Sequence, residues 1–235
     1  MAGRDGTEKA FLFGSWSLVI LLLVAAWIAA LVTSGDTQHF DERLLLAMRR
    51  PDDPTLPIGP VWLRFAALDV TALGGATVLG LGVLVTTGFL LLQGLRRTAL
   101  FVLVASIGVW LLNSELKELF GRPRPSIVPH LSGVLSLSFP SGHAMNSAAV
   151  YLTIGALLMR ITERRSLKVY SMTVAMLLVF LIGVSRLFLG VHYPTDVLAG
   201  WVIGMSWAVL CWLVERYIER RSGLDRRRHQ GLDAG

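Results

Sequence analysis

Six long apolar segments constrain this chain more than any other feature of its sequence. They cover residues 11–33, 68–93, 98–117, 143–160, 168–189 and 195–217. A helix of about 20 apolar residues crosses the hydrocarbon core of a bilayer, because each residue adds about 1.5 Å of length. Hydrophobic residues make up 54% of the chain, more than one soluble core requires. The sequence therefore predicts an all-α integral membrane protein with six transmembrane helices in a bundle.

The basic residues predict the orientation of these spans. With the segments alternating across the membrane, one side carries fourteen Lys and Arg and the other carries eight. Cytoplasmic loops of membrane proteins are enriched in Lys and Arg. We therefore expect both termini to be cytoplasmic, with residues 1–10 and a basic tail 218–235 flanking a six-span domain 11–217. This placement also accounts for the net charge of +6 without nucleic-acid binding.

The longest connection, residues 34–67, is expected on the non-cytoplasmic side. Phe40, Leu44 and Met48 recur at helical spacing, which predicts a short amphipathic helix on the membrane surface that ends before Pro51. A structural lid and a substrate gate are both compatible with this pattern.

Three polar stretches lie at the same, non-cytoplasmic ends of the predicted spans. They read "NSELKELFGRPRP" after the third span, "FPSGHAMNS" before the fourth, and "GVSRLFLGVHYPTDVLAGW" between the fifth and sixth. Charged side chains at membrane depth are costly and usually face a polar cavity or one another. A single cavity at this face would explain all three stretches.

The first two stretches suit an anion. Lys117 and Arg124 are two cations near a helix end. Ser141 is placed as the N-cap of the next helix, and Gly142 permits close approach to its backbone N–H groups. His143 would then lie beside the bound anion, where it can exchange a proton near neutral pH. Taken alone, the same residues also fit interfacial anchors and an ordinary helix cap.

The third stretch adds a candidate nucleophile. Arg186 ends the fifth span, and His192 and Asp196 are four residues apart at the start of the sixth. At that spacing the carboxylate reaches the imidazole and fixes which ring nitrogen carries the proton. The other ring nitrogen is then available to attack an electrophile. A capping Asp beside a structural His is the alternative interpretation.

Together the stretches spell K-x6-R-P, P-S-G-H and S-R-x5-H-x3-D, in that order. This combination resembles the type 2 phosphatidic acid phosphatase superfamily, which includes lipid phosphate phosphatases, isoprenyl diphosphate phosphatases and vanadium haloperoxidases. The matching residues are Lys117, Arg124, Pro125, Pro140, Ser141, Gly142, His143, Ser185, Arg186, His192 and Asp196.

The resemblance implies a role for each of these side chains. His192 would attack the terminal phosphorus and form a phosphohistidine, with Asp196 orienting its ring. His143 would protonate the leaving lipid oxygen and then activate water. The phosphate would be held by Lys117, Arg124, Ser141, Gly142 and Arg186. No metal or other cofactor is expected.

The substrate implied is a lipid phosphate that reaches the site from the outer leaflet of a bacterial inner membrane. Undecaprenyl diphosphate, phosphatidylglycerophosphate, phosphatidate and lipid A are the candidates, with undecaprenyl diphosphate preferred by family analogy. Arg122 is either a contact to a second phosphate or an interfacial anchor. The alternatives are a phosphotransferase that uses the same site and a membrane transporter. The six spans argue against a haloperoxidase, and no oligomeric state is predicted.

Overall fold

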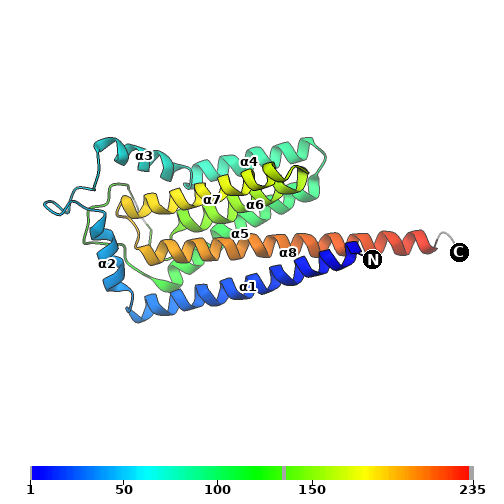
Figure 1. Cartoon of the computed structure of the whole chain (residues 1–235), viewed down its shortest axis with the longest axis horizontal. Helices are drawn as coiled ribbons and strands as arrows, with labels where there is room; N and C mark the ends of the chain where they lie inside the picture. The colour runs from blue at the N-terminus through cyan, green and yellow to red at the C-terminus, as the bar shows by residue number, and fades with distance from the viewer. Residues whose placement is uncertain (1, 134–135, 233–235) are drawn as a thin grey trace.

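The computed structural model describes residues 2–133 and 136–232, and in these residues every regular element is an α-helix. The elements in chain order are α1 (Ala2–Ser34), α2 (Gln38–Ala47), α3 (Val61–Ala72), α4 (Ala76–Leu92), α5 (Arg96–Phe120), α6 (Gly142–Ile161), α7 (Arg165–Phe188) and α8 (Pro194–Leu232). The long helices run roughly alongside one another, with α1 beside α8, and α2 and α3 lie at one end of the bundle (Figure 1). The chain is therefore an elongated helical bundle with one elaborated end.

Within the described residues, five helices are long and apolar enough to cross a membrane, namely α1, α5, α6, α7 and α8. The sixth predicted span is a bent pair, α3 and α4, which meet at an angle of 43°. We expected one helix over 68–93, so this is a correction. Gly74 and Gly75 interrupt the helix because glycine is a poor helix former. A Cβ on Gly74 would also lie 2.5 Å from a methyl carbon of Ile182, so only glycine permits this contact between the break and α7.

The predicted helix in the first connection is present as α2, which ends before Pro51. Phe40 and Leu44 of the predicted apolar stripe are exposed, whereas Asp41 and Leu45 are fully buried. The buried face is thus offset by one residue from the predicted stripe. The basic tail continues α8 to residue 232, and residues 233–235 lie outside the described part of the chain.

Small residues bring α6 and α8 into close contact. A Cβ on Gly204 would lie 2.4 Å from the carbonyl oxygen of Met145 and 2.6 Å from Cβ of Ala148, and Gly200 has a similar contact with Ala144. Helices in membranes commonly associate through small residues at this four-residue spacing. The contact fixes the starts of both helices, which carry His143 and Asp196.

The Gly204→Ala substitution is therefore expected to destabilise the bundle by about 1–3 kcal/mol, the usual cost of overpacking. Thermal unfolding of purified protein in detergent would detect this as a lower midpoint temperature. Gly82→Ala on α4 is the matched control, because its added Cβ meets nothing within 4 Å. Equal midpoints for the two variants would contradict the assigned contact.

Candidate active site

The three polar stretches of the sequence meet at the end of the bundle that carries α2 and α3. Lys117 lies in the last turn of α5, His143 in the first turn of α6 and Arg186 in the last turn of α7. His143 interacts electrostatically with Lys117, Arg124, Arg186 and His192. The structure therefore brings together side chains that are up to 75 positions apart in the chain.

His192 lies between a carboxylate and a guanidinium. Its Nδ1 is 3.5 Å from Oδ2 of Asp196, and its Nε2 is 3.1 Å from Nη1 of Arg124. A guanidinium can only donate hydrogen bonds, so Nε2 must accept and the ring proton belongs on Nδ1. This tautomer directs the free electron pair of Nε2 toward the cations of the site.

The imidazole of His192 is also kept neutral. Only 1% of the residue is exposed, and burial lowers its pKa to about 3, although the neighbouring Asp196 acts in the opposite direction. A neutral ring with one unprotonated nitrogen is the nucleophilic form of histidine.

Asp196 is held in one orientation by four groups. Its Oδ2 accepts hydrogen bonds from the Ser138 hydroxyl at 2.5 Å and the Tyr193 N–H at 2.9 Å, and it also faces His192. Its Oδ1 accepts a hydrogen bond from Nη1 of Arg122 at 2.6 Å. The carboxylate therefore cannot rotate freely, and it in turn fixes the imidazole. Ser138 carried no signal in the sequence, because a single serine in a loop has no distinctive spacing.

Three cationic side chains near this pair have no carboxylate partner in the described part of the chain. Lys117 donates to the Leu137 carbonyl, Arg124 to the carbonyls of Ser136 and Val191 (both 2.6 Å), and Arg186 to the Thr71 hydroxyl at 2.9 Å. Among the described residues, none of the three forms an ion pair with Asp or Glu. The excess positive charge at this point favours an anionic ligand.

Two buried donors strengthen the case for an anion. Ser141 occupies the N-cap position of α6, as predicted, but its side chain makes no capping hydrogen bond. In the part of the chain that the structure describes, its hydroxyl and Nε of Arg186 are buried without a hydrogen-bond partner. Buried polar groups are rarely left unpaired, and phosphoryl oxygens would satisfy both.

Gly142 has a packing reason to be glycine in addition to the predicted one. A Cβ at this position would lie 2.8 Å from Oδ1 of Asn113 on α5. Asn113 is itself buried and donates to the sulfur of Met145 at 3.4 Å. The start of α6 is therefore held close to α5, beside Lys117.

Arg122 forms two ion pairs that the sequence did not indicate. Its side chain is 10% exposed, and its two terminal nitrogens contact Asp196 at 2.6 Å and Asp41 at 2.8 Å. Burial alone lowers the pKa of Arg122, but the two carboxylates outweigh this and raise it above its ordinary value. Arg122 thus contributes at least two of its donors to carboxylates, and a contact with a second phosphate stays a prediction.

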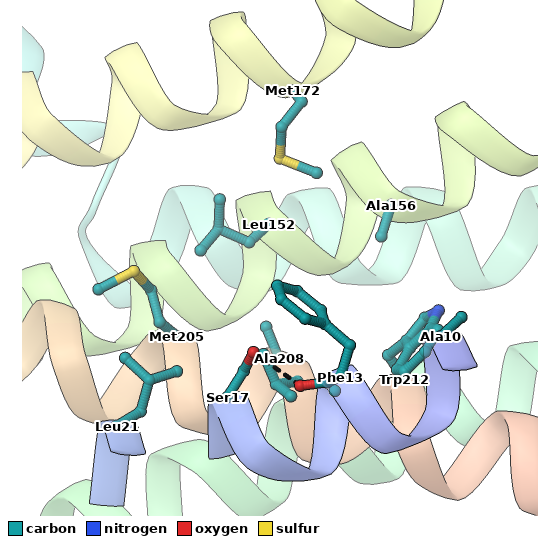
Figure 2. Close-up of a pocket in the computed structure, with 12 residues that line it drawn as sticks. Ala10, Phe13, Ser17, Leu21, Leu152, Ala156, Met172, Met205, Ala208 and Trp212 are labelled. Atoms are coloured by element: carbon teal, nitrogen blue, oxygen red, sulfur yellow. Dashed lines mark hydrogen bonds between the residues drawn. The ribbon is translucent and has the colours of Figure 1, made fainter. Parts of the chain in front are cut away.

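An apolar cavity of about 430 Å³ lies elsewhere in the bundle, between α1, α6, α7 and α8. Figure 2 shows its wall, which includes Phe13, Leu152, Met205 and Trp212. Its one hydroxyl, Ser17, is already bonded to the Phe13 carbonyl at 2.8 Å. This cavity offers no group for phosphate chemistry, so the candidate active site remains the polar end.

The donor set at the polar end is also a poor match to a metal site. Among residues 2–133 and 136–232, no group of three or more His, Cys, Asp or Glu side chains is placed to hold a metal ion. Asp196 is surrounded by cations, whereas divalent metals such as Mg²⁺ require several oxygen ligands.

The fold and this site together define a helical membrane protein with a cluster of cations around a buried histidine. The PAP2 superfamily model matches residues 97–220. Phosphatidylglycerophosphatase B of Bacillus subtilis is 33% identical over 209 residues, which cover 86% of this chain and 95% of that protein. The chain belongs to the PAP2 superfamily, and it is an enzyme of the phosphatase class, which confirms the resemblance drawn from the motifs.

Two further similarities extend the comparison. The crystal structure of a transmembrane PAP2-type phosphatidylglycerolphosphate phosphatase from Bacillus subtilis matches with a TM-score of 0.76 and 29% identity, over 86% of this chain and 98% of that one. An undecaprenyl-diphosphatase of Sulfolobus acidocaldarius is 27% identical over 128 residues, which cover 52% of this chain and 57% of that protein.

Proposed function

We propose that this enzyme removes the terminal phosphate of a membrane lipid through a phosphohistidine on His192, without a metal ion. The observation that carries the proposal is the setting of His192. Its Nδ1 side faces Asp196 at 3.5 Å, and its Nε2 faces Arg124. Arg124 is one of three cations that have no carboxylate partner among residues 2–133 and 136–232. A neutral, oriented nucleophile beside an anion pocket is the arrangement that phosphoryl transfer to a side chain requires.

In the first half-reaction, Nε2 of His192 forms a bond to the terminal phosphorus as the bond to the lipid oxygen breaks. His143 gives its proton to that oxygen, so the lipid leaves as a neutral alcohol or as a protonated phosphate. The imidazole becomes cationic as the N–P bond forms, and the charge of Asp196 stabilises it.

In the second half-reaction, His143 takes a proton from a water molecule that attacks the same phosphorus. The N–P bond breaks, inorganic phosphate is released and His192 returns to its neutral form. His143 ends protonated, ready to act again as the acid. Throughout, Lys117, Arg124, Arg186, the Ser141 hydroxyl and the backbone at Gly142 hold the phosphoryl oxygens and offset the charge of the transition state.

The proposed orientation places this site on the non-cytoplasmic side of a bacterial inner membrane. The start of α1 and the end of α8 lie at the opposite end of the bundle from α2 and α3 (Figure 1), and the positive-inside tendency assigns that end to the cytoplasm. In this arrangement residues 11–217 form the membrane domain, and residues 1–10 and 218–235 face the cytoplasm. A lipid headgroup then reaches the site from the outer leaflet.

A phosphatidylglycerophosphate-type lipid becomes the leading substrate candidate. The Bacillus subtilis relative named for this activity matches over 95% of its length, whereas the undecaprenyl-diphosphatase matches over 57% of its own. The ion pairs of Arg122 with two carboxylates also weaken the feature that favoured a diphosphate substrate. Undecaprenyl diphosphate, phosphatidate and lipid A remain in the panel to be tested.

Phosphate release in the presence of excess chelator tests this function. Purified protein in detergent is expected to release inorganic phosphate from at least one of these four lipids, at the same rate with and without EDTA. The rate is metal-independent because cationic side chains replace the metal in offsetting charge. Relative kcat/KM values across the panel would rank the substrates.

Two outcomes would contradict the proposal. Activity that EDTA abolishes and Mg²⁺ restores would require a metal in the mechanism. Consumption of the lipid without release of phosphate, together with labelling of an added alcohol, would identify a phosphotransferase instead.

A further inference from the structure

Asp41 lies outside every motif that resembles the family, yet it is fully buried next to the candidate nucleophile pair. It projects from α2, a helix that precedes the first motif residue by about 70 positions, and it contacts the start of α8. Its Oδ1 accepts a hydrogen bond from the Thr195 N–H at 3.0 Å, and its Oδ2 accepts one from the Thr195 hydroxyl at 2.6 Å. Asp41 therefore caps α8 from outside the helix, one residue before Asp196.

The second partner of Asp41 is Arg122. Nη2 of Arg122 donates to Oδ2 of Asp41 at 2.8 Å, while Nη1 donates to Oδ1 of Asp196 at 2.6 Å. The guanidinium carbon also lies 4.2 Å above the ring of Tyr193. The guanidinium of Arg122 is thus held between two buried carboxylates. The contacts run from Asp41 through Arg122 to Asp196, which faces the imidazole of His192.

We propose that Asp41 is a positioning residue for phosphoryl transfer, which acts on His192 through Arg122 and Asp196. The inference rests on the proposed function of His192. Without the charge of Asp41, Arg122 is attracted to Asp196 alone. It then neutralises the carboxylate that must stabilise the imidazolium formed in the transition state. Asp41 balances the cation, so the charge of Asp196 remains available to the ring.

The kinetic consequence is specific. The groups proposed to hold phosphate are Lys117, Arg124 and Arg186, and Asp41 contacts none of them. Loss of its charge should therefore lower kcat and leave KM nearly unchanged. If the substitution instead disturbed the phosphate-binding groups, KM would rise as well.

Asp41→Asn is the informative substitution, because the amide keeps an oxygen that can accept from the Thr195 N–H while the charge is lost. We expect kcat to fall about tenfold, within the range for coupled neighbouring groups, and KM to change less than twofold. Asp52→Asn is the matched control, because it removes the same charge from an exposed residue in the connection that follows α2. Folding is compared by thermal unfolding in detergent.

A double substitution tests whether Asp41 acts through Arg122. In the Arg122→Gln background, Asp41→Asn should not lower kcat further, because the cation it balances is gone, and removal of an unpaired buried carboxylate should partly restore activity. A further tenfold loss in the double variant would overturn the proposal. So would a wild-type kcat in Asp41→Asn, a change confined to KM, or a loss equal to the loss of folded protein. If His192→Ala keeps its activity, the proposed function fails instead, and the two failures are distinguishable.

Discussion

The His192→Ala variant is expected to lose at least about 10⁴-fold in kcat on every lipid the wild-type enzyme hydrolyses. The methyl side chain has no electron pair to attack phosphorus, and the cations that remain can bind the substrate but cannot replace the nucleophile. KM is expected to change little, since Lys117, Arg124 and Arg186 stay in place. Phosphate release at matched folded-protein concentration measures the effect.

A trapped intermediate makes this prediction sharper. After brief reaction with lipid labelled in its terminal phosphate, the wild-type chain quenched in alkali should carry label that acid removes, the stability pattern of a phosphohistidine. His192→Ala should carry none. His39→Ala is the control because His39 is exposed on α2. Label that persists in His192→Ala, or a loss of activity in the His39 control, would contradict the assigned nucleophile.

The membrane architecture was largely predictable because few backbone structures are stable in the hydrocarbon core of a bilayer. Backbone groups in hydrocarbon must be hydrogen-bonded within their own segment, so each long apolar stretch becomes a helix. The break at Gly74 and Gly75 was not predicted. Hydropathy measures how apolar a segment is, and glycine does not lower it enough to mark a bend. The contact with Ile182 that makes glycine necessary there lies more than 100 residues away.

The convergence of the three motifs at one end was predictable for a similar reason. Once the spans alternate across the membrane, each motif is assigned to the same face whatever the helix packing. The nearness of His192 to Asp196 follows from their spacing of four residues, and the structure has them 3.5 Å apart. The roles proposed for these residues await the experiments described above.

The supporting contacts could not be predicted, because they depend on partners distant in the chain. Arg122 bonds to Asp196, 74 residues away, and to Asp41, 81 residues away. The sequence contained only one weak indication that Asp41 is buried, which is the spacing of its neighbours. Asp41 and Leu45 of α2 form a second series at four-residue spacing with Arg49, which follows two residues after the helix ends, and all three are buried. From the sequence, the buried face was assigned to Phe40, Leu44 and Met48 because that series is more apolar.

The role proposed for His143 leads to an effect that depends on the leaving group. His143→Ala is expected to lower kcat on a lipid phosphate monoester by about 10²- to 10⁴-fold, the usual contribution of a general acid or base. An alkoxide is a strong base and needs a proton as it leaves. A nitrophenolate is a weak base and does not, so attack on an aryl phosphate should be nearly as fast in the variant as in the wild type.

The second half-reaction should then become visible. His143→Ala cannot activate water, so an aryl phosphate should give a burst of the phenol equal to the enzyme concentration, followed by slow turnover, with alkali-stable label retained on the chain. A lipid diphosphate should behave more like the aryl ester, because its leaving phosphate is also a weak base. Equal losses on all three substrates with no burst would show that His143 only maintains the pocket. A loss confined to the monoester without accumulated phosphoenzyme would leave it as the acid and assign the activation of water to another group.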